Sequence, residues 1–392
     1  MQLLAVCIGV ASVAVIWIAA TAPVFTYDHY WHLQSGRDLL NNVASPYLDS
    51  YSYTFLGNSI ALQPYLFQLT YAWLETHLGF KGATDAIRLI AGLLFFTSAV
   101  FFLHKVRATI TVRLLALTLL TFFVAGRMVA RPESFDFILM TFAFYLADRA
   151  RRDFSAINLL WCAFLLFAWV NFHGGIIAYV IFAMPFIDRL ANFTKKIDFV
   201  LCFKQVALWG SFFLCIGFLN QDLQHPIFQA VQFSEVWQGI AEHTPSINIK
   251  SLRDLLIIFW TCACIVIIWS MLSRNYGIAL VALVFTCASI DRVRMVPISG
   301  VAISYCFLLL AADPKAQALG VNIRAGIKQA VNAVLWAAIF GITSVNAVKS
   351  LAAKTIYPAP PVDVVNYLRE NYTGGAILNE YQWGGFLISE LH

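Results

Sequence analysis

Long apolar runs with almost no charged residues follow one another along most of the chain, and they constrain its fold more than any other feature. As a helix, a run of about 20 apolar residues crosses the roughly 30 Å hydrocarbon core of a bilayer. Hydrophobic residues make up 60% of the 392 residues and charged residues only 12%, whereas a soluble chain carries about 25% charged residues. The sequence therefore predicts an all-α polytopic membrane protein and excludes an ordinary water-soluble enzyme.

The apolar runs give about eleven expected transmembrane helices. They lie at residues 3–22, 84–104, 113–126, 134–147, 156–171, 175–190, 198–219, 255–272, 276–290, 296–311 and 329–348. The first run could also be a signal peptide, since Ala20-Thr21-Ala22 resembles a cleavage site. A retained span is favoured, because no basic segment precedes the run and Pro23 follows the cleavage position.

The connections between these runs alternate in charge, and this alternation predicts the topology. Every second connection carries a Lys/Arg cluster, of the kind that marks cytoplasmic loops. These clusters are Lys105/Arg107/Arg113, Arg149/Arg151/Arg152, Arg189/Lys195/Lys196, Arg274 and Lys315/Arg324/Lys328. We therefore expect a multi-pass protein of the bacterial inner membrane, with a cytoplasmic N-terminus and an external C-terminus. The net charge of +5 resides in these clusters, so no nucleic-acid partner is expected.

This topology requires that residues 64–79 do not cross the membrane. The segment is short, carries Gln68, Glu75 and His77, and is bounded by Pro64 and Gly79. It fits a helix lying in the membrane interface. The transmembrane domain then spans residues 1–348, with a first outer loop at 23–83 that holds interfacial helices at about 29–43 and 64–79. Residues 349–392 form a short outer segment of α/β character, with a helix over 362–371 and a strand over 376–379, which looks like the start of a longer domain.

The unusual polar residues gather in the loops of the expected outer face. Ionisable groups at the ends of spans are costly unless they are paired or face water, and each of these has an ordinary structural explanation as a cap, a paired charge or a side chain that reaches the headgroups. Their convergence from five loops on one face favours a common site. The candidate catalytic residues are Asp28, His32 and Glu133, and the candidate phosphate-binding or substrate-binding residues are Arg127, Arg131, Asn171, His173, Glu235, Arg292 and Arg294.

These residue types suit a lipid-linked phosphate as substrate. Arginine forks bind phosphate oxygens bidentately, and a nearby carboxylate can take a proton from an acceptor hydroxyl or amine. Apolar helices beside them can cover an isoprenoid tail. The sequence contains no Walker A loop, dinucleotide-binding glycine motif, HExxH or CxxC. Any group donor should therefore arrive already activated within the membrane.

Several motifs resemble a broad family of bacterial polytopic proteins similar to the GT-C glycosyltransferases, such as the polyprenyl-phosphate-dependent mannosyl and aminoarabinose transferases. They are Asp28-x-x-Trp31-His32-Leu33-x-x-Gly36, Pro46-x-x-Asp49-x-x-Ser52, Ala130-Arg131-Pro132-Glu133, Asn171-x-His173-Gly174-Gly175 and Asn379-x-Tyr-x-Trp383-Gly384-Gly385-Phe. The resemblance covers the whole chain and implies that Asp28 is the catalytic base or a ligand for a divalent metal, Mg or Mn. The second acid of the usual GT-C pair is absent, because position 26 is Thr and position 29 is His.

The expected function is therefore that of a membrane glycosyltransferase. It would move a sugar from a polyprenyl-phosphate donor to an envelope glycan, lipid or protein on the outer face. One alternative is a non-catalytic scaffold or accessory subunit of an envelope-polysaccharide assembly, which would have envelope-biosynthesis proteins as partners; the missing second acid favours it. A third is a transporter of lipid-linked substrates, for which the inverted repeat and mid-membrane charges are not evident. The expected ligands are membrane lipid and the polyprenyl-linked donor, with no cofactor beyond the metal.

Overall fold

A computed structural model describes residues 28–43, 48–58, 64–125, 127–192, 196–220, 223, 225–228, 245–248, 253–319, 361–372, 374–380 and 383–391. The expected spans at 3–22 and 329–348 lie outside these ranges. The regular elements in the described ranges are all helical, which confirms the predicted all-α class for this part of the chain. They are α2 (Asp28–Leu40), α3 (Tyr65–Lys105), α4 (Ile110–Ala125), α5 (Glu133–Arg152), α6 (Ala156–Phe172), α7 (Ile176–Ala191), α8 (Lys196–Ile216), the 3₁₀ turn η3 (Ser246–Asn248), α10 (Arg253–Leu272), α11 (Tyr276–Asp291), α12 (Met295–Ala312), α13 (Pro314–Ala318), α15 (Val362–Asn371) and α16 (Gly384–Leu391).

Several of these helices are suited to a bilayer. Among the described residues, three helices are long and apolar enough to cross a membrane: α3, residues Phe199–Ile216 of α8, and α12. Four shorter apolar helices accompany them, at Ile110–Val124, Ala156–Phe172, Leu256–Leu272 and Tyr276–Asp291. The described helices coincide in position with the runs expected from the sequence, and the total of eleven spans remains a prediction.

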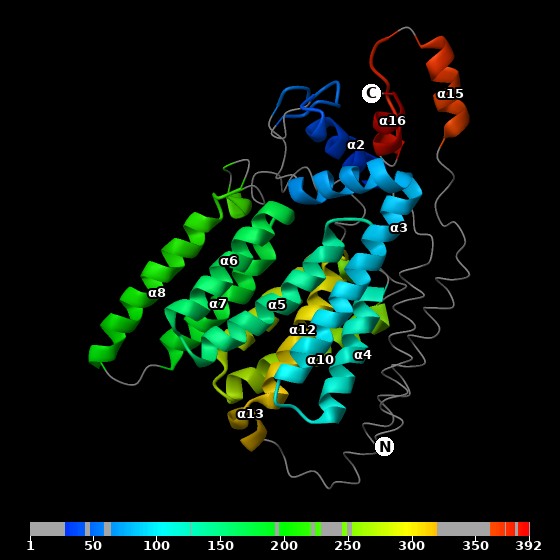
Figure 1. The fold of residues 1–392 in the computed structure, drawn as a ribbon. Helices are drawn as coiled ribbons and strands as arrows, with labels where there is room; N and C mark the ends of the chain where they lie inside the picture. Colours follow the sequence, from blue (N-terminus) through cyan, green and yellow to red (C-terminus); the bar gives the residue numbers. More distant parts are fainter. Residues whose placement is uncertain are drawn as a thin grey trace.

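Helix α3 bends sharply at Gly79, where the backbone adopts φ 69° and ψ 169°. Glycine tolerates a positive φ that other residues rarely adopt. Figure 1 shows the result: the part of α3 before the bend lies across the ends of the other helices, and the part after it runs down beside them. The helix expected over 64–79 is therefore present, with Gly79 at its end as predicted, and a second helix continues directly from it.

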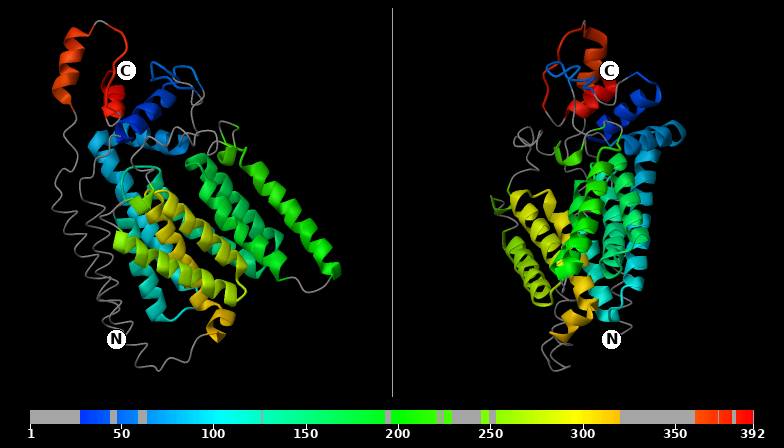
Figure 2. Two further views of the ribbon diagram at one scale, coloured as in Figure 1. Left: turned by 180° about the vertical axis from the view of Figure 1, so that it is seen from behind. Right: turned by 90° about the vertical axis from the view of Figure 1, so that its left-hand side faces the viewer.

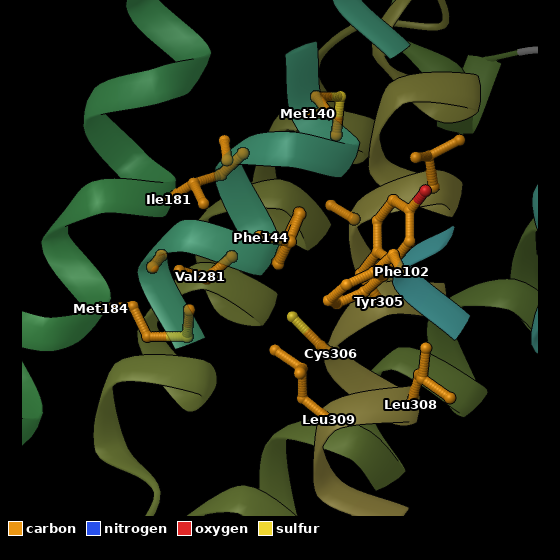
Figure 3. Packing of buried hydrophobic residues seen from close by; sticks show 14 of the residues in the cluster. Phe102, Met140, Phe144, Ile181, Met184, Val281, Tyr305, Cys306, Leu308 and Leu309 are labelled. Carbon is orange, nitrogen blue, oxygen red and sulfur yellow. The ribbon is translucent and has the colours of Figure 1, made fainter. Parts of the chain in front are cut away.

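The core lies between α3, α4, α5, α7, α11 and α12, which pack against one another in a bundle. In Figure 3, side chains from different helices meet at its centre, with the ring of Tyr305 close to Phe102. The ring centroids of these two residues are 5.1 Å apart. The Tyr305 hydroxyl is satisfied by Thr141 Oγ1 at 2.6 Å, as a buried polar group requires. The core therefore forms a continuous apolar support for the loops at the helix ends.

The C-terminal segment differs from the prediction in one respect. Helix α15 occupies the residues expected to be helical, but residues 376–380 form no strand, and residues 384–391 form the helix α16. The strand was predicted from local composition, and no neighbouring strand is available for pairing in the described part of the chain. Helix α16 packs instead on α2, where the rings of Phe386 and Tyr30 lie 5.0 Å apart and Tyr30 stacks on Phe80 at 4.9 Å.

The bundle has two dissimilar ends. One end, called the α2 end below, carries α2, α16 and the first part of α3, and the other, called the α13 end, carries α13 and the connection between α3 and α4 (Figures 1 and 2). At the α13 end, ion pairs around Arg151 link several helices, and the Arg151 side chain is only 7% exposed. Its guanidinium lies 2.8 Å from Asp148, 3.5 Å from Asp188 and 3.6 Å from Asp313.

Candidate functional site

The site at the α2 end is built on the contact between α2 and the first part of α3. Gly36 permits this contact, because a Cβ atom at that position would lie 2.1 Å from the backbone oxygen of Gln68. The Gln68 side chain then reaches His32, with 3.4 Å between Nε2 and Nδ1. Arg37 of α2 pairs with Glu75 of α3 at 2.8 Å. These contacts hold the middle and the end of α2 against α3.

The first ion pair of the site joins Asp28 to Arg131. Asp28 is the first residue of α2, and Arg131 lies in the turn between α4 and α5. The Arg131 guanidinium donates to the Asp28 carboxylate. The Asp28 side chain is 39% exposed and that of Arg131 12% exposed, so the pair lies at the boundary between the protein and its surroundings.

A second group of charges surrounds Glu133, the first residue of α5. The Arg294 guanidinium, just before α12, contacts one carboxylate oxygen of Glu133, and Arg127 Nη1 lies 4.0 Å from the other. The Glu133 side chain is 7% exposed, whereas those of Arg127 and Arg294 are 25% and 29% exposed. A carboxylate in the first turn of a helix is also stabilised by the helix dipole. Glu133 therefore places two arginines side by side at the surface of the α2 end.

A third group connects α5 to the turn after α6. The Asp136 carboxylate is buried and accepts hydrogen bonds from Trp169 Nε1 at 2.8 Å and from His173 Nδ1 at 2.6 Å. The His173 side chain remains 29% exposed. Gly174 and Gly175 follow with φ values of 34° and 68°, which turn the chain sharply into α7. The predicted Asn171-x-His173-Gly174-Gly175 motif thus presents an accessible imidazole.

Two further histidines of this end are buried in α2. His32 is 6% exposed and His29 is fully buried, and neither ring nitrogen of His29 has a hydrogen-bond partner among the described residues. Burial, followed by the positive charges of Arg131 and Arg88, lowers the pKa of His29 to about 3. Burial also lowers the pKa of His32 well below its ordinary value, with smaller contributions that include Arg131 and the neighbouring histidines. Both side chains are therefore neutral at physiological pH.

The structure brings together most of the residues predicted from the sequence. Asp28, His32, Arg127, Arg131, Glu133, His173 and Arg294 all lie in the three groups or in electrostatic contact with them. The Asn171 amide donates to the backbone oxygens of Phe167 and Leu219 at 2.9 and 2.8 Å, and its predicted substrate-binding role stays a prediction. Arg292 pairs with the adjacent Asp291 at 3.0 Å, and Glu235 lies outside the described residues.

The described residues do not offer a ligand set for the divalent metal implied by the resemblance to GT-C enzymes. Magnesium and manganese favour several oxygen ligands at one site. No group of three or more His, Cys, Asp or Glu side chains in the described ranges is arranged to hold a metal ion. The carboxylate of Asp28, the predicted ligand, contacts Arg131.

Sequence reasoning missed the residues that support the site from beneath. Asp136, Trp169 and Gln68 orient predicted residues, and Arg88 donates to the backbone oxygen of Met128 at 3.3 Å, just before the turn that carries Arg131. Of these residues, only Asp136 could have been predicted from the sequence. It lies three residues after Glu133, in the first turn of a predicted span, and this spacing puts both acids on the same helix face. The other contacts join residues far apart in the sequence.

Comparison with models of known protein families finds no family that matches the chain. Comparison with curated proteins finds no match either.

Proposed function

We propose that the protein is a membrane glycosyltransferase of GT-C type, which moves a sugar from a polyprenyl-phosphate donor to an envelope acceptor. The observation that carries the proposal is the placement of Arg131, Arg127 and Arg294 on adjacent turns at one end of an apolar helical bundle, beside acids and an accessible histidine. Phosphate recognition by arginine next to apolar helices is what a lipid-linked phosphate requires.

The proposed topology places the α2 end outside the bacterial inner membrane. The Lys/Arg-rich connections gather at the α13 end, which the positive-inside rule assigns to the cytoplasm. The packing of α16 on α2 puts the C-terminal segment on the same side as the site, in agreement with an external C-terminus. The donor head group and the acceptor would then meet outside the membrane.

The arginines would bind the donor phosphate through their exposed faces. Because each already contacts a carboxylate, the phosphate must either share the guanidinium with that carboxylate or replace it. Sharing is feasible because a guanidinium carries five N–H donors. As the glycosidic bond breaks, charge accumulates on the leaving phosphate, and the arginines would stabilise that charge where it develops. Asp28, the base predicted from the sequence, and the part-exposed His173 are the candidate proton acceptors at this end.

The test is sugar transfer in proteoliposomes, with a panel of labelled polyprenyl-phosphate sugars as donors. We expect transfer by the wild type and a large loss in both Arg131→Ala and Arg131→Lys, because lysine keeps the charge but loses the fork geometry. Lys81→Ala is the matched control, since the Lys81 side chain is highly exposed on α3, where it pairs with Asp85 one turn away. Full activity in both Arg131 variants would reduce Arg131 to a structural residue.

A non-catalytic scaffold is the second candidate. It is favoured by the pairing of Asp28 with Arg131 and of Glu133 with Arg294, because such pairs also occur as purely structural links between helices. A scaffold would transfer no sugar with any donor, and Asp28→Asn would then weaken only the assembly of the protein or its binding to envelope-biosynthesis partners.

A further inference from the structure

At the α2 end, the imidazole of His173 is held in one orientation by a buried acid. Its Nδ1 lies 2.6 Å from Asp136, whose other carboxylate oxygen accepts from Trp169 at 2.8 Å. We propose that His173, held by Asp136 and Trp169, is the group that takes the proton from the sugar acceptor. This inference rests on the proposed glycosyltransferase function.

The Asp136 carboxylate fixes the tautomer of His173. An ionised carboxylate only accepts hydrogen bonds, so the proton of the neutral imidazole must lie on Nδ1. The lone pair then lies on Nε2, the nitrogen of the part-exposed ring that is not bonded to Asp136. This is the arrangement by which a buried Asp prepares a histidine as a general base in hydrolases. Trp169 prevents the carboxylate from turning away, because it binds the second oxygen.

The ion pairs that are lost or gained on protonation favour His173 over Asp28 as the proton acceptor. Protonation of Asp28 would neutralise its carboxylate and remove the ion pair with Arg131. Protonation of His173 would instead create a positive charge beside the buried Asp136 carboxylate and so gain an ion pair. The first change costs an interaction that the resting site already has, and the second adds one. Asp28 is accordingly a positioning residue for Arg131.

The neighbouring histidines do not suit the role. His29 and His32 are buried in α2, whereas the His173 side chain is 29% exposed. A general base must reach the proton that it removes, and only the last of these three imidazoles can meet a substrate from the surface.

The proposed step balances without a cofactor. The acceptor oxygen forms a bond to the anomeric carbon of the sugar, and its proton passes to Nε2 of His173. The bond between the anomeric carbon and the phosphate oxygen breaks, and its electron pair leaves with the polyprenyl phosphate beside Arg131 and Arg294. The imidazolium later returns its proton to water.

The sharpest test is Asp136→Asn. Because Trp169 donates to this side chain, the asparagine oxygen should keep that contact and turn its NH₂ group toward His173. The imidazole proton would then move to Nε2, and the lone pair would no longer face the acceptor. We expect transfer to fall by about 10²–10⁴-fold, the usual contribution of a general base, while binding of polyprenyl phosphate is retained. Asp254→Asn, an exposed acid in the first turn of α10, is the matched control and should keep full activity.

A second variant separates chemistry from structure. His173→Ala should be inactive and should regain part of its transfer activity when imidazole is added, because free imidazole can replace the missing base. A purely structural histidine would not be rescued in this way. Full turnover by His173→Ala without imidazole, or an inactive variant that imidazole fails to rescue, would overturn the assignment.

A readout independent of transfer keeps this inference separate from the proposed function. Diethyl pyrocarbonate acylates an exposed imidazole nitrogen that carries a lone pair, and mass spectrometry locates the label. We expect labelling of His173 but not of the buried His29 in the wild type, and at least severalfold slower labelling of His173 in Asp136→Asn. Unchanged labelling in that variant would refute the tautomer argument. Absence of transfer by the wild type, together with the expected labelling, would instead refute the proposed function.

Discussion

The buried ion network at the α13 end predicts a large cost for replacing one arginine. Arg151 contacts Asp148, Asp188 and Asp313, which come from α5, α7 and the residue before α13. Arg151→Met keeps much of the side-chain volume and removes the charge. Asp148 retains Arg152, whose Nε lies 2.9 Å away. The other two carboxylates lose their contact with the guanidinium.

The structure sets the expected magnitude. Removing one partner of a buried ion pair costs about 3–5 kcal/mol, because the remaining charge stays buried without compensation. Asp188 still accepts from the backbone N–H of Gly277 at 2.7 Å, and Asp313 from that of Lys315 at 2.9 Å. Because these hydrogen bonds partly compensate the two carboxylates, we expect Arg151→Met to lower the free energy of unfolding by about 3 kcal/mol, the lower end of that range. The double variant Arg151→Met/Asp188→Asn should be less destabilised than Arg151→Met, since it removes one of the uncompensated charges.

The assay is equilibrium unfolding of the purified protein in detergent, followed by tryptophan fluorescence. Arg149→Met is the matched control, because Arg149 lies on the same helix but is exposed, and its replacement should change the free energy of unfolding by less than about 0.5 kcal/mol. A loss in Arg151→Met no larger than that of Arg149→Met would refute the reasoning, and would mean that the carboxylates are solvated.

Three further predictions concern packing, pH and topology. Gly36→Ala should destabilise the contact between α2 and α3 by about 1–3 kcal/mol, as overpacking does, measured by the same unfolding assay; an unchanged stability would contradict the close approach. The lowered pKa of His29, from 6.5 to about 3, means that the folded state binds fewer protons, so its contribution to stability is complete above pH 6.5 and is lost as the pH falls toward 3. Thermal melts across this range should show a weaker pH dependence in His29→Gln than in the wild type, and equal slopes would exclude His29 as a cause. In a cysteine-free background, Tyr53→Cys should be labelled from outside intact cells and Arg149→Cys should not; the reverse pattern would invert the topology.

The helices could be predicted from the sequence because apolar runs and their boundaries are local features. The end of the interfacial helix at Gly79 and the helix over 362–371 were also predicted, since glycine and helical periodicity act over a few residues. The direct continuation of α3 beyond Gly79 was not predicted. The prediction of a strand over 376–379 was wrong, because a β-strand needs a partner strand, which local composition does not reveal. The Lys/Arg clusters were interpreted only as topology signals, and this interpretation missed that Arg151 is buried among acids from other helices.

The candidate site was predictable in its residue types but not in its pairings. The Arg131-Pro132-Glu133 turn and the His173-Gly174-Gly175 turn stood out because charged groups are rare beside spans. Asp28 pairs with Arg131, and Glu133 pairs with Arg294. The partners in each pair are at least 103 residues apart in the sequence, so no local pattern predicts these pairs. Part of the motif pattern proves to be structural: Asp49 Oδ1 accepts from the backbone N–H groups of Tyr51 and Ser52 in a tight turn.

The central claim is that the arginines of the α2 end bind a lipid-linked phosphate, and an experimental structure of the full chain with added polyprenyl phosphate tests it most directly. We predict density for the phosphate within hydrogen-bonding distance of the Arg131 and Arg294 guanidinium groups, beside Asp28, with the isoprenoid tail against the apolar helices. Phosphate density at the Lys105 and Arg113 connection of the α13 end, or no bound lipid at saturating concentration, would contradict the claim.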